Sequence, residues 1–169
     1  MQGGEIRTER KQKGFTLIEL LIIIGIIGIL FAVILVAVDP ARRFAEARNA
    51  VRRQDVRDVV EAVLEYMKDN RNTFPKNIDA LATSYQMLGT ATTGCNATAC
   101  AGIPVESLTA ACSDLTSDLV ETYLAEIPMD PNTGTAENTR YAINKTSGNR
   151  IEVIACDSEL GVTTIRAKR

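Results

Sequence analysis

Hydrophobic side chains are concentrated in one uninterrupted segment near the start of the chain. Between Phe15 and Val38, only Thr16 and Glu19 are clearly polar. At about 1.5 Å per residue, a helix of this length extends about 36 Å, which is enough to cross a hydrocarbon core of about 30 Å. The run is too long for the apolar part of a secretory signal peptide, which has about 7–15 residues. We therefore expect residues 15–38 to form a retained membrane-spanning helix.

The pattern becomes amphipathic after this segment. The sequence VDP at positions 38–40 predicts a kink or a brief break, because Pro40 lacks an amide hydrogen and disfavours a helical residue before it. Residues 39–70 are expected to form a helix whose apolar face packs on a sheet and whose other face is charged. The apolar positions recur at helical spacing and include Val56, Val59, Val60, Val63, Leu64 and Met67.

The remaining residues, 71–169, predict a globular head. Residues 71–139 form a loop region in which we expect two short helices, at 78–85 and at 113–127, the second of them capped by Ser113. Short turns between extended segments predict an antiparallel sheet within 140–169, with strands at 140–144, 150–156 and 162–167. The predicted fold class is α+β, with a long N-terminal α-helix that has an apolar protruding half and an amphipathic half packed on the C-terminal antiparallel sheet.

The composition offers little for catalysis. The 169 residues include no histidine, which is the side chain most often used for acid–base work and metal binding. Nothing in the sequence pairs a nucleophile with a base or forms a phosphate-binding loop. The formal net charge of −2 says little about partners, but without the first 14 residues, which hold four basic and two acidic side chains, 15 basic and 19 acidic residues remain, and this net charge of −4 argues against a general binder of polyanions. We therefore expect a protein that is not an enzyme.

Four cysteines, all beyond the apolar helix, predict two disulfides. Their spacing does not match a paired zinc site. An even number of cysteines in an exported part of a chain favours oxidation, whereas free buried thiols are the alternative. Three connectivities are possible. We expect Cys95–Cys100 to close a small loop and Cys112–Cys156 to tie a loop to a strand.

The sequence GFTLIE at positions 14–19 follows a short basic leader and precedes the apolar helix. This arrangement resembles the class III signal of type IV pilins and related pseudopilins. The resemblance implies that a prepilin peptidase removes residues 1–14 by cutting between Gly14 and Phe15, and that Phe15 is then N-methylated. The layout of the chain, with a helix, a variable loop region, a C-terminal sheet and late cysteines, is similar to that of the family as well.

Glu19 is the fifth residue of the expected mature chain. A carboxylate within lipid costs several kcal/mol and is therefore a candidate for function. The resemblance implies a role in assembly, with the positive N-terminal amine of Phe15 on a neighbouring subunit as the partner; the amine of the same chain is the alternative. Many family members carry a proline inside the first helix. Here Gly25 and Gly28 are the candidates for helix flexibility, with Pro40 after them.

The resemblance implies a structural subunit that polymerises with other copies of itself, through its N-terminal helix, into a type IV pilus filament. The precursor would cross the cytoplasmic membrane once with its head outside, and the assembled filament would lie at the cell surface. Adhesion, twitching motility and DNA uptake are the expected uses. A pseudopilin of a type II secretion system is the first alternative. A single-pass membrane enzyme or sensor that keeps residues 1–14 is the second.

Two further features bear on partners. The segment EIPMDPNTG at 126–134 is similar to a connector of major pseudopilins, some of which bind calcium. Asp130, Asn132 and Asp157 are therefore weak candidates for a calcium site, against a plain turn. Six arginines follow the apolar helix and are expected to pair with acids of neighbouring stems, to bind anionic lipid or DNA, or to form a solvated face: Arg42, Arg43, Arg48, Arg52, Arg53 and Arg57.

Overall fold

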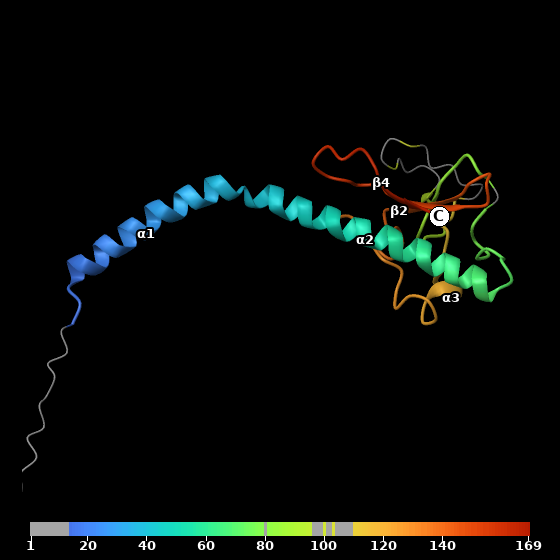
Figure 1. Ribbon diagram of the computed structural model, residues 1–169, viewed down its shortest axis with the longest axis horizontal. Coiled ribbons are helices and arrows are strands. Elements are labelled where there is room, and N and C mark those ends of the chain that lie inside the picture. Colours follow the sequence, from blue (N-terminus) through green and yellow to red (C-terminus); the bar gives the residue numbers. More distant parts are fainter. Residues whose placement is uncertain (1–13, 80, 96–99, 101–102, 104–109) are drawn as a thin grey trace, which may run out of the picture. The chain divides into compact units, whose positions relative to one another are not determined.

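The computed structural model describes residues 14–79, 81–95, 100, 103 and 110–169 (Figure 1). The expected leader lies outside these residues except for Gly14. The chain forms two compact units, Met1–Pro40 and Ala41–Arg169. The elements are α1 (Leu17–Val38), α2 (Pro40–Asp69), β1 (Gln86–Met87), α3 (Thr116–Leu119), β2 (Tyr141–Lys145), β3 (Ile151–Ala155) and β4 (Ile165–Lys168).

The two predicted helical segments are separate helices. Asp39 follows α1 with a left-handed backbone (φ 43°), which an α-helix cannot continue. Pro40 is then the first residue of α2, where a missing amide hydrogen costs no helical hydrogen bond. The predicted break at VDP is therefore confirmed. α1 runs through Gly25 and Gly28 without interruption, and their flexibility stays a prediction.

α2 packs its apolar face on one side of a four-stranded antiparallel sheet with the order β1-β2-β3-β4. The predicted stripe from Val56 to Met67 is buried, apart from Leu64, which is partly buried. Full burial of a valine side chain contributes about 1.5–3 kcal/mol. Strand residues alternate between the two faces, so that Tyr141 and Ile143 of β2 lie in the cluster beneath α2. The α+β class and the helix-on-sheet packing are thus confirmed.

The opposite face of the sheet is covered by the cysteine-bearing region. Met87, Ala142 and Ile154 form a second buried cluster with the four cysteines. Because both faces are covered, every residue of β3 is buried. The disulfides therefore form part of a second core layer in the C-terminal unit.

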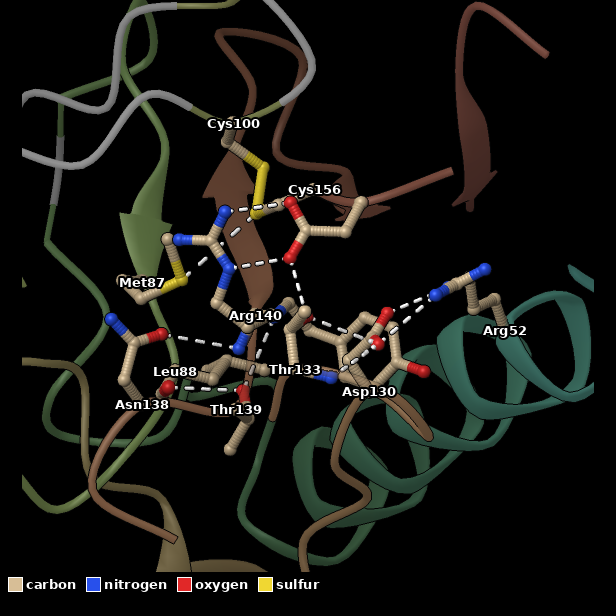
Figure 2. Close-up of a disulfide and its surroundings, with 12 residues drawn as sticks. Arg52, Met87, Leu88, Cys100, Asp130, Thr133, Asn138, Thr139, Arg140 and Cys156 are labelled. Carbon is tan, nitrogen blue, oxygen red and sulfur yellow. Dashed lines mark hydrogen bonds and ion pairs between the residues drawn. A yellow bond between two sulfur atoms is a disulfide. The ribbon is translucent and has the colours of Figure 1, made fainter. Parts of the chain in front are cut away.

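The predicted number of disulfides is confirmed, but the predicted pairing is wrong. The bonds join Cys95 to Cys112 and Cys100 to Cys156. The N–H of Cys112 donates to the carbonyl of Ala91 at 2.8 Å, so the backbone before Cys95 runs beside the backbone at Cys112. Cys156 directly follows β3 and faces the second cluster, where Cys100 reaches it (Figure 2). Backbone pairing, rather than nearness in sequence, selected the partners.

The helix predicted at 78–85 does not form among the described residues of that segment. The side chain of Asp79 accepts a hydrogen bond from the backbone N–H of Leu81 (2.9 Å). The backbone N–H of Asp79 donates to the side-chain oxygen of Gln86 (2.8 Å). Such local bonds replace helical ones. The chain then continues into β1, which pairs with β2 at the sheet edge and was not predicted.

The helix predicted at 113–127 is reduced to α3. Leu119 is fully buried in the core beneath α2, and the backbone turns extended at Val120 and left-handed at Glu121 (φ 70°). Ser113 does not cap the helix, because its hydroxyl donates to the carbonyl of Asn77 (2.8 Å). The three predicted strands do form as β2, β3 and β4. The last begins at Ile165 rather than at residue 162.

The bonded loops give a prediction for stability. In the loop-entropy description of disulfides, Cys100→Ser/Cys156→Ser should lower the free energy of unfolding by about 4 kcal/mol, and Cys95→Ser/Cys112→Ser by about 3 kcal/mol. The loss is larger for Cys100–Cys156 because this bond closes a loop of 56 residues, whereas Cys95–Cys112 closes one of 17. Denaturant unfolding of the full chain in detergent measures both losses. A peptide linking Cys95 to Cys100 in a non-reducing digest would contradict the pairing.

Candidate functional site

The expected cleavage site lies in exposed, non-helical backbone directly before α1. Gly14 and Phe15 are both exposed, and neither belongs to the helix. A Cβ added at Gly14 would meet nothing within 4 Å. Exposed backbone without helical hydrogen bonds is the kind of segment that proteases cut. The peptide bond between Gly14 and Phe15 is thus accessible in this conformation.

Thr16 and Glu19 define the first turn of α1. Thr16 is the N-cap, and its Oγ1 accepts a hydrogen bond from the backbone N–H of Glu19 at 3.2 Å. The spacing of the two residues is that of a capping box, but only the threonine half of the box is present. Within the described part of the chain, the Glu19 carboxylate makes no hydrogen bond or ion pair. This acid is positioned by the helix and open to a partner.

The surface of α1 is apolar on all sides, and none of its 22 residues is buried. By length and composition, α1 is able to cross a membrane. A helix that is hydrophobic all round belongs in lipid or in a protein core. Together with the motif before it, α1 fits a membrane-anchored precursor. Its large exposed side chains include Leu17, Ile22, Ile27, Phe31, Ile34 and Val36.

A buried charged cluster joins α2 to two loops. The guanidinium of Arg52, whose side chain is 1% exposed, donates from Nε to Asp130 Oδ2 (2.6 Å) and from Nη2 to Asp130 Oδ1 (3.0 Å). Arg52 Nη1 also donates to Glu159 Oε2 at 2.7 Å, and Arg48 binds the same carboxylate through two hydrogen bonds. Asn49 completes the cluster through the backbone of Glu159. We call these five residues the Arg52 cluster.

The Arg52 cluster holds its carboxylates in the charged form. Hydrogen bonds from Arg48 and Arg52 lower the pKa of Glu159 to about 2. Burial alone would raise the pKa of Asp130, but hydrogen bonds from Arg52 and from the amides of Asn132 and Thr133 outweigh it, so that this pKa lies below its usual value. The cluster fixes the connector at Asp130 and the β3–β4 loop at Glu159 onto α2.

The weak calcium candidates are brought near one another, but the carboxylate oxygens of Asp130 and Asp157 have other partners. Thr133 Oγ1 contacts both Asp130 and Asp157, and Arg140 donates to both oxygens of Asp157 at 2.7 Å. Figure 2 shows this chain of contacts from Arg52 to Arg140. The backbone amide of Asn132 donates to Asp130 Oδ1 (2.9 Å). Over the described residues, no three His, Cys, Asp or Glu side chains are grouped to hold a metal.

The six arginines that follow the apolar helix divide into three groups in the structure. Arg42 and Arg43 pair with Glu46 on α2 itself, and both pairs are exposed. Arg48 and Arg52 belong to the Arg52 cluster. Two arginines, Arg53 and Arg57, form no ion pair with any described residue. None of these contacts was expected as an interaction within the chain.

The sequence did contain a signal for the Arg52 cluster. Ala45, Asn49, Arg52 and Val56 are separated by four, three and four residues, and all four are buried. This is the spacing of one helix face. An arginine on the core face of an amphipathic helix predicts a buried counter-charge. Its identity depends on which loops cross that face.

Residues 10–35 match the family described as the prokaryotic N-terminal methylation motif. Among curated proteins and among solved structures, no match to the chain is significant. The matched residues contain the exposed Gly14–Phe15 bond, Glu19 and most of α1. Residues 10–35 therefore carry the class III signal motif of type IV pilins and pseudopilins, which supports a pilin-like or pseudopilin precursor.

Proposed function

We propose that this chain is the precursor of a type IV pilus subunit. A prepilin peptidase cuts between Gly14 and Phe15, and Phe15 is then N-methylated. The mature chain leaves the membrane and polymerises with copies of itself through α1. Its role is structural rather than catalytic, and its C-terminal unit forms the outer surface of a filament at the cell surface.

The observation that carries this proposal is the combination of α1 and Glu19 directly after the motif. α1 exposes apolar side chains on every side, and such a surface needs lipid or other helices around it. In a bundle of like helices, water is excluded from the first turn as well. An unpaired carboxylate is costly there, whereas the amine that cleavage creates at Phe15 supplies the opposite charge.

The N-terminus of the mature protein provides the first test. In cells with active prepilin peptidase, intact-mass measurement should find a chain that begins at Phe15 and carries one methyl group. In cells without the peptidase, the chain should retain Met1. A protein that begins at Met1 in both strains would contradict the proposal.

Electron microscopy of the cell surface provides the second test. An antibody against the C-terminal unit should label long filaments that disappear when the gene is deleted. Processed chains that form no surface filaments, but are required for secretion of other proteins, would instead identify a pseudopilin. Pilus subunits and pseudopilins share the motif, so the length of the filaments and the effect on secretion distinguish the two.

A further inference from the structure

The flank of α2 beside β4 carries two arginines, Arg53 and Arg57, that form no ion pair with any described residue. Arg53 and Arg57 line a hollow of about 240 Å³ together with Thr164 and Ile165 at the start of β4. Arg57 also lines an adjoining hollow of about 210 Å³ near the end of the chain. Both side chains are exposed. β4 is an edge strand of the sheet, so this flank is open to another molecule.

The lack of partners distinguishes these two arginines from the others on α2. The other four have carboxylate partners within the chain, at Glu46, Asp130 or Glu159. Arg53 and Arg57 are separated by four residues and lie about 6 Å apart along the helix axis. They therefore present two parallel positive groups to one side.

A matching pair of acids lies further along the same helix. Glu61 and Glu65 are also separated by four residues, and both line a hollow of about 190 Å³ with Tyr123 and Leu124. Glu65 forms no ion pair or hydrogen bond with any described residue, and Glu61 is reached only by Arg169, at 4.0 Å. Like charges four residues apart on a helix repel one another, so each pair gains from an opposite pair.

We propose that Arg53 and Arg57 of one copy bind Glu61 and Glu65 of the next copy, in that order. The two pairs have the same spacing, so both contacts form when two parallel α2 helices are offset by eight residues, about 12 Å along the axis. The proposal rests on the proposed function, because a filament of like copies keeps their helices parallel. It adds the surface through which neighbouring C-terminal units make contact.

The geometry makes the contact heterologous. Eight residues correspond to a rotation of about 80° around the helix, so the centres of the basic and acidic pairs point about 80° apart, although Arg57 and Glu61 line one hollow where the pairs meet. Each copy then uses one pair toward its predecessor and the other toward its successor. A heterologous contact that does not close on itself generates an open filament. Exposed ion pairs are individually weak and are screened by salt, so this contact sets the register of the copies and adds to the association through α1.

Charge reversal tests the contact in cells with the assembly machinery. Arg53→Glu/Arg57→Glu and Glu61→Arg/Glu65→Arg should each lower the yield of sheared filaments about tenfold, because like charges then face each other. The four substitutions combined should restore the yield, because the charges are exchanged and not lost.

The control is Arg71→Glu/Arg150→Glu, which makes the same change in charge at exposed residues that line none of these hollows. It should leave the yield unchanged. Normal yield from the Arg53→Glu/Arg57→Glu chain would overturn the contact and leave the proposed function intact. So would low yield from the combined variant, which would assign the arginines to another partner. Absence of filaments from the unmodified chain would overturn the proposed function itself.

A cross-link gives a direct readout. Arg57→Lys keeps the charge and introduces an amine, which a carbodiimide joins to an adjacent carboxylate without a spacer. Treated filaments should contain covalent dimers in which position 57 is linked to Glu65. Within one helix these positions are about 12 Å apart along the axis, beyond the reach of a direct amide bond. Filaments in which position 57 is linked only to Glu61 of its own helix, four residues away, or to no carboxylate, would overturn the contact.

Discussion

Replacing Glu19 by alanine is expected to leave cleavage intact and to lower filament yield about a hundredfold. In the proposed filament, removal of one partner of a buried ion pair costs about 3 kcal/mol, and about 1.4 kcal/mol corresponds to a factor of ten in equilibrium. The helix itself should not change, because Thr16 caps α1 through the backbone N–H of Glu19, which alanine retains. Quantified sheared filaments and intact mass measure the two effects.

Two further variants separate charge from shape. Glu19→Gln keeps the size of the side chain and should assemble as poorly as Glu19→Ala if the charge is the essential property. Glu46→Ala removes a partly exposed acid whose ion pairs, among the described residues, are those with Arg42 and Arg43, and it should assemble normally. Normal filament yield from Glu19→Ala would show that the carboxylate is dispensable.

Arg52→Met should destabilise the C-terminal unit by about 3–5 kcal/mol. Methionine keeps much of the apolar length of the side chain but leaves Asp130, whose side chain is fully buried, without its guanidinium. An unpaired buried charge costs this much. Denaturant unfolding of the full chain in detergent measures the loss. The matched control is Arg53→Met, which removes an exposed arginine one position away and should change stability by less than about 0.5 kcal/mol.

The pH dependence identifies the cause of the loss. Arg48 and Arg52 hold the folded-state pKa of Glu159 at about 2, below the ordinary value of 4.5, and the folded-state pKa of Asp130 is also lowered. Lowered carboxyl pKa values add stability that is fully present above the ordinary pKa and is lost as pH falls toward the folded pKa. The unmodified chain should therefore lose stability below about pH 4.5.

The difference between the unmodified chain and Arg52→Met should then narrow in acid. Without the guanidinium, burial raises the pKa of Asp130, so protonation relieves the unpaired charge. The 3–5 kcal/mol expected near pH 7 should shrink as pH falls from 4.5 toward 2. A loss of stability that is independent of pH would mean that methionine disturbs packing rather than charge.

The residues that stabilise the C-terminal unit and the expected processing residues lie in different units of the chain. The Arg52 cluster and the two disulfides fix loops onto the sheet and α2 within Ala41–Arg169. Gly14, Phe15 and Glu19 lie outside that unit. Variants of Arg52 should therefore unfold more easily while their N-terminus is still processed. Variants of Glu19 should instead keep the stability of that unit and the cleavage of the N-terminus, and lose only filament yield.

The local pattern of the sequence determined α1, α2 and the three main strands. The apolar run of α1 and the stripe from Val56 to Met67 each arise from the repeat of one helix, and the strands are indicated by extended segments between short turns. The break at Asp39 and the order of residues 14–19 are local as well. The expected roles of Gly14, Phe15 and Glu19 follow from the resemblance of residues 14–19 to the class III signal, which depends on local order alone.

Contacts between distant segments were decided only by the tertiary structure. Cys95 pairs with Cys112 because the backbone at Ala91 binds the backbone at Cys112, and spacing in the sequence carries no record of that pairing. The partners of Arg52 come from 78 and 107 residues further along the chain. The helical pattern of α2 shows that Arg52 is buried. The pattern does not show which loop lies over Arg52, because loop paths depend on the packing of the whole sheet.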